Sequence, residues 1–363
     1  MRTDLALEAH QVVLGRDGIN EIPGVEVQSE KTAVAEITRM HVRTAQGSQA
    51  MGKMIGYYVT ISSESLRNRN KDEQEQLAQT LAQELTAYFQ HLGLGENASA
   101  LVVGLGNWNA TPDALGPKVV GELMVTRHLW EMSPPELRGG LRPVAAIAPG
   151  VLGLTGIETG EIVLGIVEKI GPDVVICVDA LASRSSDRVC STIQIADTGI
   201  HPGSGVGNKR LAITSQTLGR PVVAIGVPTV VHAMTIVGDA MELLAQEMGY
   251  KPRLGLTPPQ AVQSPPILDP NRIRVMNGNP VEAGADGQGR QDIPRNDAFG
   301  LPLDADQRRY MLQHLLQPYM GSMIVTPREI DALIGDVAEV LAGGLNAALH
   351  PKLDLTEILK YLG

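Results

Sequence analysis

Two aspartates follow aliphatic runs that have the composition of buried strands. Asp179 ends the run Asp173–Asp179 (DVVICVD), and Asp113 follows Ala100–Gly106 (ALVVGLG) through the loop Asn107–Pro112 (NWNATP). In an open parallel sheet, side chains just beyond the carboxyl ends of the strands line the ligand crevice. If the two strands are neighbours, both carboxylates are expected to converge on one crevice.

Two carboxylates that lie close together favour hydrolytic chemistry. They cannot both ionise cheaply, so one keeps a proton while the other stays charged. The charged member accepts a proton from water, and the protonated member polarises the carbonyl that the water attacks. A structural explanation stands beside this hypothesis, because Asp113 follows Thr111 and Pro112 in a sequence typical of a helix start. Asp179 would need a partner to offset its desolvation at the end of a buried strand.

A histidine offers a second kind of chemistry at the same place. His201 lies in the Gly-rich run 199–207 (GIHPGSGVG), just after Asp197. It would supply a neutral nitrogen ligand if Asp113 and Asp179 held a divalent metal between them. Most lone loop histidines are only solvated, so no cofactor is expected and a divalent metal stays the alternative.

Nucleophilic catalysis has little support in the sequence. The segment Gly203-Ser204-Gly205 lacks the fuller G-x-S-x-G pattern of a serine nucleophile. Cys190 is more simply interpreted as a small buried thiol than as a reactive group.

The middle of the chain alternates between two patterns. Short aliphatic runs, which are typical of strands buried on both faces, occur at Ala100–Gly106, Pro143–Ala148, Asp173–Asp179, Thr192–Ile195 and Pro221–Val227. Helical patterns lie between them at Asp113–Trp130, Thr159–Ile170 and Val231–Met248. This alternation predicts an α/β fold with a mostly parallel sheet and helices on both faces.

The flanking regions differ in character. Upstream, Lys53–Ser62 has the β-branched and aromatic composition of a strand, and Lys71–Leu92 has apolar residues at helical spacing. From 251 to about 302 the chain is rich in Pro, Gly, Asn and Asp without a period, which indicates an irregular excursion. Helices are then predicted at Asp304–Leu316, Pro327–Ala347 and Leu355–Leu362. We interpret residues 1–363 as a single α/β domain with this excursion.

Composition excludes several classes of protein. The formal net charge is -10, and no basic run has interleaved aromatic residues, so direct binding of nucleic acid is not expected. No stretch approaches about 18 uninterrupted apolar residues, so no membrane segment is expected. With two cysteines and no signal-peptide pattern, the chain is expected to work in a reducing cytoplasm.

Several long strings of residues resemble the germination protease family. They are Arg2–Ala9 (RTDLALEA), Leu105–Gly116 (LGNWNATPDALG), Val178–Arg184 (VDALASR), Asp197–Arg210 (DTGIHPGSGVGNKR) and 346–350 (NAALH). The resemblance implies an endopeptidase of the spore core that degrades small acid-soluble proteins coating spore DNA. It also implies that the catalytic acids fall on Asp113 and Asp179.

The same family is similar to hydrogenase maturation proteases, which implies a related parallel α/β fold. Their metal-contacting acids align with Asp113 and Asp179, and His201 is the nearest equivalent of their histidine ligand. A metal-dependent protease is therefore one alternative. A non-catalytic module that binds spore proteins without cutting them is another.

The resemblance further implies a homotetramer made as a zymogen with a short N-terminal propeptide. In this sequence Met1 directly precedes RTDLALEA. Either the sequence corresponds to a processed form, or this member carries little propeptide and is controlled otherwise. Control by a propeptide therefore stays open.

Overall fold

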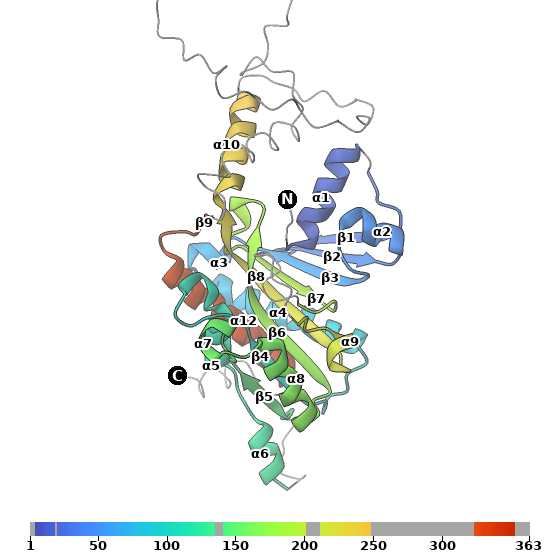
Figure 1. Cartoon of the computed structure of the whole chain (residues 1–363), viewed down its shortest axis with the longest axis vertical. Coiled ribbons are helices and arrows are strands. Elements are labelled where there is room, and N and C mark those ends of the chain that lie inside the picture. The colour runs from blue at the N-terminus through green and yellow to red at the C-terminus, as the bar shows by residue number, and fades with distance from the viewer. Residues whose placement is uncertain (1–3, 19, 135–140, 201–210, 248–322, 353–363) are drawn as a thin grey trace, which may run out of the picture. The chain divides into compact units, whose positions relative to one another are not determined.

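The computed structural model describes residues 4–18, 20–134, 141–200, 211–247 and 323–352 (Figure 1). The chain divides into two compact units, Met1–Val237 with Leu316–Gly363, and Gly238–Leu315. The second is described only over the end of helix α10 (Ala233–Glu247). The excursion at 251–302 and the helices predicted at Asp304–Leu316 and Leu355–Leu362 lie outside the described residues.

The strands of the first unit form one sheet. In the described residues it has nine strands in the order β1-β2-β3-β7-β8-β6-β4-β5, with β9 paired to β8. The strands are β1 (Val25–Lys31), β2 (Glu36–Val42), β3 (Gly56–Ser62), β4 (Ala100–Gly104), β5 (Val144–Ile147), β6 (Val174–Ser183), β7 (Thr192–Ala196), β8 (Val222–His232) and β9 (Ile324–Val325).

The sheet is mixed, which corrects the prediction of a mostly parallel one. Neighbours β5, β4, β6 and β8 are parallel, whereas β1, β2, β3 and β7 pair antiparallel and β7 joins β8 antiparallel. For β1 and β2 the physical reason is connection length. Strands β1 and β2 are joined by a short turn, and short turns join only antiparallel neighbours, whereas a parallel crossover needs a longer segment. Aliphatic composition does not carry this information. The α/β class itself is confirmed.

Helices cover both faces of the sheet, as predicted. Alternate residues of β6 point to opposite faces: Ile176 packs in one hydrophobic cluster with α4 (Lys71–His91) and α12 (Ile330–Leu349), and Val175 packs in another with α8 (Thr159–Ile170). A third cluster holds α1 (Ala6–Asp17) against β2 and β3. The remaining helical elements are α2 (Ala45–Met51), α3 (Ser65–Asn68), η1 (Thr111–Asp113), α5 (Leu115–Gly121), α6 (Arg127–Met132), α7 (Leu152–Thr155), η3 (Ser186–Arg188) and α9 (Ser215–Leu218).

The agreement with sequence periodicity varies along the chain. Helices α4 and α8 match their predicted ranges, and α12 matches the one predicted at Pro327–Ala347. The segment predicted as one helix at Asp113–Trp130 is instead broken into η1, α5 and α6.

Helix α12 is long and apolar enough to cross a membrane by length and composition alone. However, 78% of its most apolar window is buried inside the protein, where it packs against α4 and α5. Asp336 on this helix receives a hydrogen bond from Arg69 Nε at 2.6 Å. Helix α12 is therefore buried as a core helix is.

Glycines let α5 approach the sheet at backbone distance. A Cβ on Gly116 would collide with the backbone of Leu105 and lie 2.6 Å from the carbonyl oxygen of Val178. A Cβ on Gly104 would likewise collide with the carbonyl of Gly116. The start of α5 therefore lies directly against the end of β4 and the middle of β6.

This contact predicts a destabilising effect of Gly116→Ala. Overpacking of this kind costs about 1–3 kcal/mol, and here the obstacle is backbone, which yields less than a side chain. Gly121→Ala is the matched control on the same helix, because nothing lies within 4 Å of its Cβ position. We expect urea denaturation to show a clear loss of unfolding free energy for Gly116→Ala and none for Gly121→Ala. Equal stability of the two variants would contradict the close approach.

Candidate active site

Asp113 is held at the start of α5 by a tight loop after β4. Gly106 has φ +117, and a Cβ there would collide with the carbonyl oxygen of Asp113. The backbone N–H of Asn107 donates to that same oxygen at 2.9 Å, and the N–H of Asp113 donates to Ala110 at 2.7 Å. The buried hydroxyl of Thr229 on β8 donates to the carbonyl of Pro112 at 2.6 Å. These hydrogen bonds close the loop on itself and anchor it to β8.

Asp179 lies within β6 rather than at its end. The strand continues to Ser183, which corrects the predicted strand end at Asp179. Its register partner on β8 is Gly226, which has no side chain and leaves the space above it to Leu181. One Asp179 oxygen accepts the backbone N–H of Ala180 at 2.9 Å.

The structure brings Asp113 and Asp179 to the same corner of the sheet. Strands β4 and β6 are parallel neighbours with Gly104 opposite Val178, and the N–H of Leu105 donates to Val178 at 2.8 Å beyond the end of β4. Burial raises the pKa of Asp179 to about 8, and the charge of Asp113 contributes to the shift. Asp179 as a residue is only partly buried, but protein atoms surround its carboxyl group closely. Desolvation is therefore the main cause of the raised pKa of Asp179. Burial and the neighbouring charge of Asp113 therefore both favour the protonated form of Asp179.

A third carboxylate, which sequence reasoning missed, belongs to this corner. Asp4 precedes α1, and its Oδ2 accepts the backbone N–H of Ala182 at 3.1 Å. Its charge also contributes to the raised pKa of Asp179. Lys53 donates to the carbonyl oxygen of Asp4 at 2.9 Å, and burial lowers the pKa of this lysine. The only sequence signal was the position of Asp4 within the string RTDLALEA.

The third ligand of the metal alternative is His201. His201 lies outside the described residues. Within the described parts of the chain, no three His, Cys, Asp or Glu side chains are placed so that they could hold a metal ion.

The cysteines have the surroundings of structural thiols. Cys177 and Cys190 are free and buried. Burial raises the pKa of Cys190 to about 11 and that of Cys177 further, so both thiols stay protonated at neutral pH.

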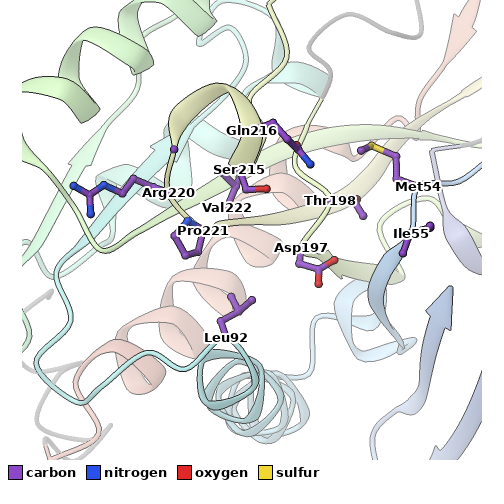
Figure 2. A pocket seen from close by; sticks show the side chains of 11 residues that line it. Met54, Ile55, Leu92, Asp197, Thr198, Ser215, Gln216, Arg220, Pro221 and Val222 are labelled. Atoms are coloured by element: carbon purple, nitrogen blue, oxygen red, sulfur yellow. The ribbon is translucent and has the colours of Figure 1, made fainter. Parts of the chain in front are cut away.

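A cavity of about 620 Å³ lies elsewhere on the sheet (Figure 2). Its lining includes Met54, Ile55, Leu92, Asp197, Thr198, Ser215, Gln216, Gly219, Arg220, Pro221 and Val222. Burial raises the pKa of Asp197, whose Oδ1 accepts the N–H of Tyr57 at 2.9 Å. Val222 begins β8, whereas Gly226 further along is the partner of Asp179. Neither Asp113 nor Asp179 lines this cavity. We therefore assign the chemistry to the corner of the two aspartates and not to the cavity.

The fold and this corner define a class: an α/β protein with an acidic pair at the carboxyl side of two parallel strands. Comparison with known proteins is more specific. The family model of germination protease matches residues 4–362. Germination proteases of Bacillus cytotoxicus, Bacillus cereus and Bacillus mycoides are each 42% identical over 361 residues, covering 98% of this chain and 95% of theirs. The chain belongs to the germination protease family, a family of peptidases.

The raised pKa of Asp179 predicts a pH-dependent gain of stability in Asp179→Asn. Between the ordinary pKa of 3.8 and the raised value of about 8, the folded state binds a proton that the unfolded state releases. The stability from this proton is fully present below the ordinary pKa and is lost as pH rises through the raised one. Asparagine does not titrate. We expect the melting temperature of Asp179→Asn, relative to the wild type, to rise across this window in differential scanning calorimetry. A constant difference would contradict the raised pKa.

Proposed function

We propose that the chain is an endopeptidase that initiates degradation of small acid-soluble spore proteins during germination, with Asp113 and Asp179 activating the attacking water. The observation that carries the proposal is the acidic pair formed by Asp179 on β6 and Asp113 in η1, which follows the neighbouring parallel strand β4. Membership of the germination protease family supports it. The proposal includes a homotetramer, made as a zymogen, in the cytoplasm of the spore core.

The proposed reaction divides the work between the two carboxyl groups. The Asp113 carboxylate takes a proton from water while the water oxygen attacks the peptide carbonyl carbon. Asp179, whose raised pKa favours its protonated form, gives its proton to the carbonyl oxygen and neutralises the developing charge. As the C–N bond breaks, the proton on Asp113 passes to the leaving nitrogen. Asp179 regains a proton from a hydroxyl group of the tetrahedral intermediate, which becomes the new carboxyl group. The pair returns to its starting state.

The test is cleavage of a purified acid-soluble spore protein, with products identified by mass spectrometry. We expect internal cleavage by the wild type, and a loss of about 100-fold or more in kcat/KM for Asp113→Asn or Asp179→Asn, as is usual when general acid–base catalysis is removed. Full activity in both variants would refute the assignment of the site.

Asp173→Asn is the matched control, at the residue just before the same strand. Asp173 precedes β6 at its amino end, where it accepts the N–H and the hydroxyl of Ser99 at 2.7 Å each. The same change of charge there is expected to lower stability and leave the cleavage rate unchanged. Activity that is lost on chelation and restored by a divalent ion would favour the metal-dependent alternative. A substrate that is bound but intact would favour the binding module.

A further inference from the structure

The pairing of β6 with β8 is interrupted just beyond Asp179. A bulge shifts the register between Leu181 and Ala182, and the residue opposite Leu181 is Pro228, which has no N–H to donate. The carboxylate of Asp4 accepts the N–H of Ala182 at this bulge, at 3.1 Å. It thereby supplies a hydrogen bond where the regular ladder of the sheet breaks.

The backbone of Asp4 is itself held by two side chains that are distant in the sequence. Its carbonyl oxygen accepts Lys53 Nζ at 2.9 Å and Gln194 Nε2 at 3.1 Å. Gln194 Oε1 accepts the N–H of Ala6 at 2.6 Å, so the side-chain amide of this β7 residue forms hydrogen bonds to the backbone on both sides of Leu5. Burying a lysine is costly because its charged form loses solvation, as its lowered pKa reflects. The residues just before α1 are therefore held by hydrogen bonds from both Lys53 and Gln194.

The charged and titratable groups facing Asp179 are few in the described part of the chain. Asp113 faces it from η1, Asp4 from the segment before α1, and Cys177 from its own strand. Strand β8 contributes Gly226, which has no side chain. Asp4 is therefore one of two carboxylates acting on Asp179, and the other belongs to the proposed catalytic pair.

We propose that Asp4 is a positioning residue of the active site, which holds the bulged end of β6 through Ala182 and sets its negative charge beside Asp179. This inference rests on the proposed function. The hydrogen bond that Asp4 accepts from Ala182 orients the strand that carries Asp179. The negative charge of Asp4 favours the state in which the pair of Asp113 and Asp179 keeps one proton. Asp4 does not itself contact the reacting atoms in this assignment.

Two substitutions separate the two contributions of Asp4. Asparagine keeps an oxygen that accepts the N–H of Ala182 but removes the charge, whereas alanine removes both. We expect Asp4→Ala to lower kcat about tenfold or more with little change in KM, because small displacements of catalytic groups affect the chemical step. We expect Asp4→Asn to recover much of that kcat and to move the alkaline fall of the pH–rate profile to lower pH.

Glu8→Gln is the matched control on α1. Glu8 is 4% exposed and accepts the N–H groups of Arg184 and Ser185 at 2.9–3.1 Å, so it also anchors α1 to the segment after β6. It is not among the groups that shift the pKa of Asp179. This variant is expected to lower the melting temperature while leaving the pH–rate profile unchanged.

A titration of the Asp179 carboxyl by ¹³C NMR decides the inference without any need for activity. The midpoint is expected to fall in Asp4→Asn and to stay unchanged in Glu8→Gln. An unmoved midpoint in Asp4→Asn overturns the inference, as does a wild-type kcat in a folded Asp4→Ala. An inactive wild-type chain would instead overturn the proposed function, and the NMR result would still decide whether Asp4 acts on Asp179.

Discussion

The close backbone contact of α5 with the end of β4 and the middle of β6 is the constraint on which the acidic corner depends. Without Cβ atoms at Gly104 and Gly116, the helix lies directly on the sheet, and Gly106 turns the chain so that Asp113 returns to the same corner. A side chain at any of these positions would push η1 away from β6. The separation of the two carboxylates is thus set by backbone packing, which is stiffer than any side-chain contact.

Concentrating carboxylates in one corner opposes folding, and the surrounding structure offsets part of that cost. Asp179 lies beside two other acids and is largely desolvated, which is why it keeps its proton. Backbone N–H groups provide the compensation: that of Ala180 for Asp179, and that of Ala182 for Asp4. Lys53 adds a buried positive charge close to Asp4 and Glu8. Keeping a carboxyl group protonated at neutral pH therefore costs folding free energy, and a neutral side chain at the same position would not carry this cost.

Sequence reasoning succeeded where the physics was local. Aliphatic runs marked β4, β6 and β8, helical periodicity marked α4 and α8, and strand-end logic placed Asp113 and Asp179 together because their strands are neighbours. It failed where partners are distant in the chain. The first described helix, α1, and strands β1 and β2 were not identified, and β1 is almost wholly exposed, so it lacks the apolar alternation that marks a strand. Beyond its position in the string RTDLALEA, Asp4 had no signal that pointed to the site, because its contacts are with Ala182 and Gln194, which are far away in sequence.

The mixed character of the sheet explains how that distant residue reaches the site. Parallel β4 and β6 bring Asp113 and Asp179 to one end, as in any open α/β sheet. Because β7 runs antiparallel between β3 and β8, Gln194 lies in register with Gly226, the partner of Asp179. Paired residues on neighbouring strands share a face, so the Gln194 amide projects on the same side of the sheet as Asp179. Its hydrogen bonds to Asp4 and Ala6 hold the segment around Asp4 on that side. A purely parallel sheet would end in the same acidic pair, but it would lack the antiparallel strand that anchors the third carboxylate.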